Sequence, residues 1–345
     1  MPQQLTELWY RERARASLLL PLGWLYRGLL FLRARAYTAG WLRSETAGKP
    51  VVVVGNLTVG GTGKTPLAVW LARELNARGL RVGIVSRGYG GRESRVPRWV
   101  EARAQWREVG DEALILARRS GCPTVVGSDR VAAARALAPA VDVIVADDGL
   151  QHLRLRRDCE IVVIDGARGF GNGRVLPAGP LREPLARLGR ADALVVNGSA
   201  VHASLARGLC GERLLEMRLV GEEALRVDAA AAPRPLAAWR GERVHAVAGI
   251  GNPARFFAAL RAHGIGVIEH AFPDHHPFAA AELEFGDALA VLMTEKDAVK
   301  CTTFGNPRLW YVPVEAHFAA ADAHELLTRV LAKVRGRLPE SGGQL

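Results

Sequence analysis

A glycine-rich loop followed by lysine and threonine carries the clearest chemical signal in this sequence. The loop contains Gly60, Gly61 and Gly63, and Lys64 and Thr65 follow directly. Glycines let successive backbone N–H groups converge on a phosphate chain, a lysine can reach the outer phosphates, and a threonine hydroxyl suits Mg²⁺. This combination predicts that the loop binds a nucleoside triphosphate. The expected nucleotide-binding residues are Thr58, Val59, Gly60, Gly61, Thr62, Gly63, Lys64 and Thr65.

The segments on either side of the loop agree with a P-loop. Four valines, Val51 to Val54, predict a strand buried on both faces, and the Ala- and Leu-rich stretch to Ala72 predicts a helix. Thr58 stands where the full pattern G-x-x-x-x-G-K-[ST] has glycine. Dimerising partition and cell-division ATPases carry a similar loop but have a lysine where this chain has Val59. A switch ATPase of that class is therefore the alternative and not the first interpretation.

Two adjacent aspartates provide the second signal. Asp147 and Asp148 end the apolar stretch that begins at Val141, and glycine follows them. A strand that delivers a carboxylate at its end is the arrangement in which an aspartate holds Mg²⁺, directly or through water, beside the P-loop threonine. We therefore expect Mg²⁺ at Thr65, Asp147 and Asp148.

Other ionisable residues lie where strands or helices are expected to end. Asp111 or Glu112 opens a predicted helix, where capping would explain either residue. Asp274, His275 and His276 follow a predicted strand and could bind a metal or form an ordinary surface loop. The weaker candidates for substrate contact are Arg87, Tyr89, Glu112, His152, Arg182 and Glu183.

The composition limits the class of protein. A chain of 345 residues can hold two domains, and 46 basic against 35 acidic residues favour an anionic partner such as nucleic acid, an acidic lipid surface or a phosphorylated substrate. No nucleic-acid-binding pattern is evident, so we expect no nucleic-acid partner. The cysteines are too widely spaced for a zinc knuckle or a disulfide framework: Cys122, Cys159, Cys210 and Cys301.

The first 49 residues form a distinct segment. Ser17 to Leu32 is an apolar run of 16 residues that contains Arg27, which is shorter than the ~18 apolar residues of a spanning helix. Seven arginines and one lysine against three glutamates give the segment a surplus of five positive charges. Leucines at helical spacing, with tryptophans and tyrosines, predict an amphipathic helix in the interface of an anionic membrane. The alternative is a helix packed in the core or against a domain.

Apolar stretches alternate with helical ones and predict an α/β fold with a mostly parallel, P-loop NTPase-like sheet. The last strand of that sheet is expected at residues 191–199, and a final strand of the chain at 308–316. We expect an amphipathic membrane-associating segment at 1–49, a kinase-like P-loop domain at 50–227, a smaller α/β domain that closes over the site at 228–335, and a polar tail at 336–345.

Seven short motifs together resemble those of the tetraacyldisaccharide 4′-kinase family of bacterial lipid A synthesis. In chain order, from Gly55 to Lys300, they are GNLTVGGTGKTP, SRGYGG, VGDE, ADDGLQH, LPAGPLREP, FPDHHPF and TEKDAVK. The resemblance also accounts for Thr58, because the P-loop of that family accepts Ser or Thr there.

The resemblance implies transfer of the γ-phosphoryl group of ATP, with Mg²⁺, to the 4′-hydroxyl of a tetraacyl-glucosamine disaccharide 1-phosphate, which yields lipid IVA. It implies Asp111 as the base and His275 as the residue that assists or orients it. Lys64 and Asp148 complete the expected catalytic set, because phosphoryl transfer needs charge neutralisation more than covalent help. It places the protein on the cytoplasmic face of the bacterial inner membrane, with no obligate protein partner expected. A membrane-associated regulatory P-loop ATPase is the alternative.

Overall fold

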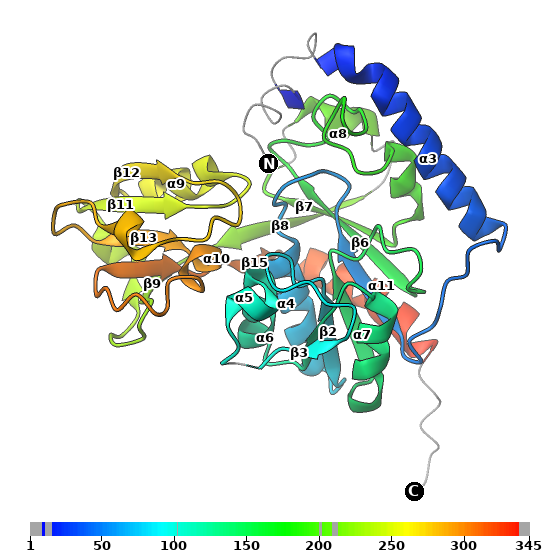
Figure 1. Ribbon diagram of the computed structural model, residues 1–345, viewed down its shortest axis with the longest axis horizontal. Helices are drawn as coiled ribbons and strands as arrows, with labels where there is room; N and C mark the ends of the chain where they lie inside the picture. Colours follow the sequence, from blue (N-terminus) through cyan, green and yellow to red (C-terminus); the bar gives the residue numbers. More distant parts are fainter. Residues whose placement is uncertain (1–8, 11–15, 102, 200–201, 209–212, 338–345) are drawn as a thin grey trace, which may run out of the picture.

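The structure, a computed structural model, describes residues 9–10, 16–101, 103–199, 202–208 and 213–337. These residues form a nine-stranded sheet and a six-stranded sheet in two adjacent units (Figure 1). Cys210 and the predicted tail beyond residue 337 lie outside the described residues.

The nine-stranded sheet is mostly parallel, as expected. Its strand order is β15-β8-β7-β6-β1-β5-β2-β4-β3, with β1 (Val51–Gly55) at the centre. The edge strands β3 (Arg98–Trp99) and β15 (Glu315–Phe318) run antiparallel to their neighbours. The other strands are β2 (Val82–Ser86), β4 (Thr124–Val126), β5 (Val143–Asp147), β6 (Cys159–Asp165), β7 (Ala193–Asn197) and β8 (Leu214–Val220).

Helices cover both faces of this sheet because its central strands are apolar on both faces. On one face α4 (Lys64–Asn76) and α11 (Ala320–Arg335) pack against a core that includes Val52. On the other face α7 (Arg130–Leu137) packs against a core that includes Val53. The parallel strands therefore bring the loops after their carboxyl ends to one edge, where ligands bind in such folds. The other helical segments of this unit are α5 (Trp106–Val109), α6 (Asp111–Ser120), η2 (Ala138–Ala140), η3 (Leu185–Arg190) and α8 (Ala203–Gly208).

The six-stranded sheet has the order β10-β9-β14-β13-β11-β12. Strands β11 to β14 are parallel, whereas β9 and β10 are antiparallel. Trp239 and Phe257 fill the core on one face, and Phe278 and Leu283 fill it on the other. The elements are β9 (Glu223–Arg226), β10 (Arg234–Pro235), η4 (Leu236–Trp239), β11 (Arg243–Ala248), α9 (Pro253–Ala262), β12 (Gly266–Ala271), η5 (Ala280–Leu283), β13 (Val291–Thr294), α10 (Glu295–Ala298) and β14 (Leu309–Val312).

The chain passes between the two sheets twice, which the sequence analysis did not predict. The expected final strand at 308–316 is two strands, β14 in the second sheet and β15 in the first, separated by Pro313, which has no N–H to donate to a ladder. The other crossing is at Gly221, where a Cβ would lie 2.7 Å from Val312 Cγ1. Strands β8 and β15 and helix α11 belong to the first unit, so β7 is not the last strand of the first sheet. Because β9 already belongs to the second unit and the chain returns to the first unit at β15, residues 228–335 are not one contiguous unit.

Helix α3 (Leu20–Thr38), preceded by η1 (Ser17–Leu19), lies along the outside of the first unit (blue in Figure 1). Gly23 is buried against Ala178, and the Tyr26 hydroxyl donates to Arg182 O at 3.0 Å. The exposed side of η1 and α3 is mostly apolar, although Arg27 also lies on it. Its large apolar side chains are each more than half exposed: Leu18, Leu22, Trp24, Leu25, Leu29, Phe31 and Leu32. Helix α3 is therefore not a core helix, but its inward side does pack against the first unit, as the alternative of a helix packed against a domain predicted. Among the described residues, no helix is both long and apolar enough to span a bilayer.

Candidate active site

The P-loop connects β1 to α4 and has the backbone shape that glycine permits. Gly60 and Gly63 have φ angles of 101° and 98°. A Cβ on Gly63 would also lie 2.6 Å from Asn197 Nδ2, so a larger residue would collide with the neighbouring strand. Gly63 is the N-cap of α4, and no side chain caps this helix. The first turn of α4 can therefore offer its N–H groups to an anion.

Lys64 points toward the end of β5. Its Nζ donates to Asn56 Oδ1 at 3.0 Å and lies 3.6 Å from Asp148 Oδ1. Asn56, which is fully buried, also donates to Thr58 O at 2.7 Å. The sequence did not single out Asn56, although this residue lies between the valine strand β1 and the glycines of the P-loop.

Asp147 and Thr65 form a site that suits a divalent cation. The Thr65 hydroxyl donates to Asp147 Oδ2 at 3.3 Å, whereas Asp147 Oδ1 is buried without a hydrogen-bond partner. Burial, together with the Glu112 and Asp148 carboxylates, raises the pKa of Asp147 to about 7. A cation bound to Asp147 Oδ1 would give this oxygen a partner and would stabilise the buried carboxylate charge. Mg²⁺ is commonly held by one or two carboxylates and substrate phosphates.

Asp148 has a different environment from Asp147. Arg182 Nη1 donates to both carboxylate oxygens of Asp148 at 3.0 Å, and Lys64 lies on its other side. Although burial alone would raise the pKa of Asp148, Lys64 and Arg182 lower it to about 2. Asp148 also has a φ of 49°, which turns the chain after β5. The two aspartates therefore face different partners.

Arg182, Glu183 and His152 lie in the same region. Gln151 Nε2 donates to Glu183 Oε1 at 3.0 Å, and burial raises the pKa of Glu183. Burial and the nearby Arg130 lower the pKa of His152 to about 4, so its ring is neutral at pH 7. Of the expected substrate residues, Arg182 therefore contacts Asp148 directly, and Glu183 is connected to Arg182 through Gln151.

The structure brings Asp111 and His275 together from the two units. Asp111 is the first residue of α6 and His275 follows β12; His275 Nδ1 lies 3.0 Å from Asp111 Oδ2. Gly110 is the N-cap of α6, so Asp111 does not cap that helix. Although burial alone would raise the pKa of Asp111, His275 and Lys296 lower it. The Tyr89 ring lies 4.5 Å from the His275 ring.

Two lysines that follow β13 complete this cluster and were missed by sequence reasoning. Lys296 Nζ lies 3.1 Å from His275 Nε2, 3.0 Å from Glu112 Oε1 and 3.1 Å from Asp274 Oδ1. Lys300 Nζ donates to Asp297 Oδ1 at 2.9 Å and lies 3.9 Å from Asp111 Oδ2. The signal was their charge at the end of an apolar strand, within the motif TEKDAVK.

The second unit also contacts the P-loop. Arg255 Nη2 donates to Asn197 Oδ1 at 2.6 Å, and Asn197 Nδ2 donates to Thr62 O at 2.8 Å. A Cβ on Gly251 would lie 3.0 Å from Gly61 N. These contacts join the loop after β11 and the start of α9 to the nucleotide-binding loop, and the sequence analysis did not predict them.

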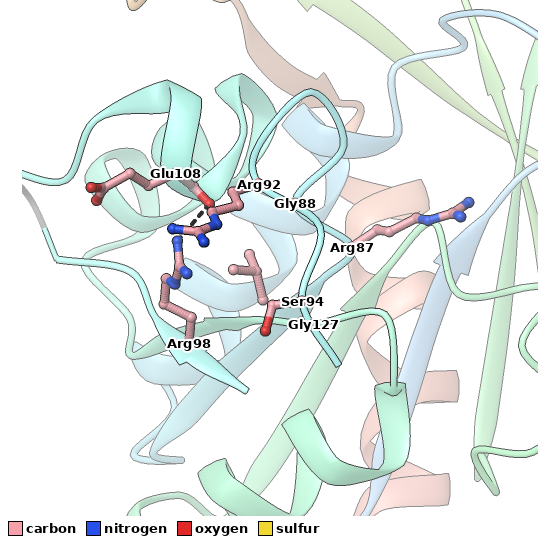
Figure 2. Close-up of a pocket in the computed structure, with 8 residues that line it drawn as sticks. Arg87, Gly88, Arg92, Ser94, Arg98, Glu108 and Gly127 are labelled. Atoms are coloured by element: carbon pink, nitrogen blue, oxygen red, sulfur yellow. Dashed lines mark hydrogen bonds between the residues drawn. The ribbon is translucent and has the colours of Figure 1, made fainter. Parts of the chain in front are cut away.

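Two further candidates, His276 and Arg87, pair with residues outside this cluster. His276 Nε2 is 3.0 Å from Glu282 Oε1, whereas His275 contacts Asp111 and Asp274 contacts Lys296. The three residues therefore have separate partners, which does not favour the option that they bind a metal together. The described residues contain no group of three or more metal-ligating side chains. Arg87 lines a cavity of about 10 Å³, room for one water, and its side chain extends away from Arg98 (Figure 2).

Comparisons with known proteins agree on one family. The family model described as tetraacyldisaccharide-1-P 4′-kinase matches residues 15–334. A tetraacyldisaccharide 4′-kinase of Alkalilimnicola ehrlichii is 52% identical over 318 residues, which is 91% of this chain and 92% of the relative. One of Stenotrophomonas maltophilia is 50% identical over 298 residues, 86% of this chain and 88% of the relative. The crystal structure of LpxK from Aquifex aeolicus in complex with ATP matches with a TM-score of 0.75 and 29% identity, over 92% of this chain and 99% of that one.

Proposed function

Because the chain belongs to the tetraacyldisaccharide-1-phosphate 4′-kinase family, we propose that it transfers the γ-phosphoryl group of ATP to the 4′-hydroxyl of tetraacyldisaccharide 1-phosphate. The product is lipid IVA, an intermediate of lipid A biosynthesis. The observation that carries the proposal is the contact between Asp111 and His275, at 3.0 Å, at the edge of the sheet that also carries the P-loop. This contact supports the proposal that Asp111 acts as a base near the triphosphate site.

The nucleotide half of the site would hold ATP by charge and backbone. The N–H groups at the start of α4 would bind phosphate oxygens, and Lys64 would move from Asn56 and Asp148 to the outer phosphates. Thr65 and Asp147 would hold Mg²⁺, which neutralises charge on the β- and γ-phosphates when bound. Asp148, which is paired with Arg182, would act on the cation through water or orient Lys64.

The acid–base half would prepare the acceptor. Asp111 accepts the proton of the 4′-hydroxyl while the oxygen forms its bond to the γ-phosphorus and the bond to the β-phosphate oxygen breaks, which releases ADP. His275 holds the Asp111 carboxylate in position. Because such a transfer depends mostly on positioning and charge, the fixed geometry of Asp111 matters more than its strength as a base.

The second unit would exclude water from the reaction. Gly251 approaches the P-loop backbone and Arg255 is hydrogen-bonded to Asn197, so this unit covers the site where the γ-phosphate would lie. Excluding water at this stage protects ATP from hydrolysis.

Helix α3 would bring the enzyme to its lipid. Its apolar outward side suits the headgroup boundary of an anionic membrane, in keeping with the positive surplus of the first 49 residues. Its inward side contacts the substrate loop, because Tyr26 bonds Arg182 and Arg33 Nη2 donates to Gln151 O at 2.8 Å. We place the protein as a peripheral enzyme on the cytoplasmic face of the bacterial inner membrane. The dimerising switch ATPase is not retained, since Val59 replaces its lysine.

A labelling experiment tests the activity. The protein, γ-labelled ATP, Mg²⁺ and a tetraacyl-disaccharide 1-phosphate in detergent micelles should yield label in the lipid fraction with wild type. Lys64→Ala should abolish it, and Lys333→Met, which removes a surface lysine paired with Asp192, should not. ATP hydrolysis without labelled lipid, where an established enzyme of the family labels it, would refute the proposal.

A further inference from the structure

We propose that Lys296 is a positioning residue that fixes the tautomer of His275, so that the imidazole carries its proton on Nδ1 and donates it to Asp111. The proposal rests on the proposed function, in which Asp111 is the base.

The imidazole is held at both nitrogens. His275 Nδ1 lies 3.0 Å from Asp111 Oδ2 and 3.2 Å from Asp111 Oδ1, and Nε2 lies 3.1 Å from Lys296 Nζ. The Tyr89 ring packs against the imidazole at 4.5 Å, and His275 N donates to Gly249 O at 3.2 Å. With both ring edges and one face occupied, the ring has a single orientation.

The donors and acceptors of these contacts decide where the proton lies. A lysine ammonium has three donors and no acceptor, so His275 Nε2 must accept from Lys296 and carries no proton. A neutral imidazole then has its proton on Nδ1, which faces a carboxylate that can only accept. The opposite tautomer would place two lone pairs against each other at 3.0 Å and a proton against an ammonium.

The surroundings keep Lys296 charged. Its Nζ lies 3.0 Å from Glu112 Oε1 and 3.1 Å from Asp274 Oδ1, and only 17% of its side chain is exposed. Although burial alone would lower the pKa of Lys296, these carboxylates and Asp111 raise it above its ordinary value.

This network connects closure of the two units to preparation of the base. Lys296, Asp274 and His275 belong to the second unit, and Glu112 and Asp111 belong to α6 of the first. The ammonium therefore reaches Glu112, and the imidazole reaches Asp111, only when the units are together. Asp111 then has a hydrogen bond that fixes its carboxylate before the acceptor hydroxyl arrives.

The test uses Lys296→Met, which removes the donor, with Lys296→Arg as the conservative variant and Lys333→Met as the control. Nitrogen NMR of histidine-labelled protein reports which ring nitrogen is protonated, and His275→Gln identifies the His275 signal among the nine histidines. We expect Nδ1–H in wild type and in the control, and a mixture of tautomers in Lys296→Met. The kcat of Lys296→Met should fall about 10²-fold while the KM for ATP stays within about twofold. Lys296→Arg should recover the Nδ1–H signal and part of the activity.

Three results would overturn the proposal. They are a wild-type imidazole protonated on Nε2, an unchanged tautomer in Lys296→Met, and a fall in kcat that Lys333→Met reproduces. If Lys296→Met does not fold, the protonated nitrogen of His275 in the spectra of wild type and Lys296→Arg still tests the proposal. The NMR measurement needs no turnover. Failure of the lipid-labelling experiment would therefore refute the proposed function, whereas the tautomer of His275 would still be tested independently by the NMR spectrum.

Discussion

The two halves of the candidate site are built in different ways. The nucleotide half lies within the first unit, and its central residues are consecutive from Thr58 to Thr65. The acid–base half joins Asp111 to His275, which is 164 residues away in the other unit. A site made from one segment is shaped by its own backbone, whereas a site made across an interface exists only while two bodies are held together. The halves should therefore fail in different ways.

In the acid–base half, the largest effect should come from Asp111→Asn. This substitution keeps the shape of the side chain but removes the base and the charge that His275 contacts. We expect kcat to fall about 10³-fold with ATP affinity unchanged, because the P-loop contacts are in the other half. Lys64→Ala should instead weaken both ATP binding and turnover. Equilibrium binding of ATP and single-turnover rates measure the two quantities, and comparable loss of ATP affinity in both variants would contradict the division into halves.

A smaller effect is expected from Arg255→Ala, which weakens the connection between the halves. Arg255 donates to Asn197, which in turn holds Thr62. Loss of a hydrogen bond from a charged group costs ~1.5–3 kcal/mol, so kcat/KM for ATP should fall about tenfold or more.

The matched control for Arg255→Ala is Arg261→Ala. Arg261 is on the same helix, α9, but pairs with Glu269 in an exposed position. Equal kinetics for the two variants would show that Arg255 does not contribute to the site.

The double substitution Leu25→Ser and Leu29→Ser concerns neither half directly. It makes the outward side of α3 more polar, and removing even part of the ~1.5–3 kcal/mol that a buried leucine contributes should lower binding to anionic vesicles about tenfold. Soluble ATP binding should not change. Val96→Ser is the control, since Val96 is 72% exposed and is not part of α3. A vesicle sedimentation assay decides, and equal partitioning of both proteins would exclude α3 as the contact.

The smallest effect should come from Asp142→Asn, on the surface away from both halves. The hydrogen bond from Arg81 lowers the pKa of Asp142 to about 2, below its unfolded value of about 4. A lowered folded-state pKa means that the pair stabilises the protein above pH 4 and loses this contribution as the pH falls through about 2. We expect unchanged kcat and a slightly lower melting temperature at pH 7. A melting curve at pH 7 and another near pH 2 should show the difference between variant and wild type shrinking in acid.

Sequence reasoning succeeded where the physical requirement was local. Short stretches of sequence were enough to predict the valine strand β1, the glycine-rich loop in which Gly60 and Gly63 have positive φ angles, and the strand that ends at Asp147. The strands on either side of Pro313 were predicted as one strand, because a proline in an apolar stretch does not indicate which sheet the residues before and after it will join. Lys296 was missed because a lysine after a strand is usually solvated, and only burial against Glu112 and Asp274 gives it a role.

The sequence by itself determined the parallel sheet, the P-loop and the pair of aspartates, because periodicity and backbone freedom act over short distances. The tertiary structure decided that β15 and α11 return to the first sheet, that His276 turns to Glu282, and that Asp111 and Asp147 have separate partners. It also decided the charge environment of each carboxylate. Burial and neighbouring charges set these pKa values, and both depend on contacts between residues that are remote in the chain.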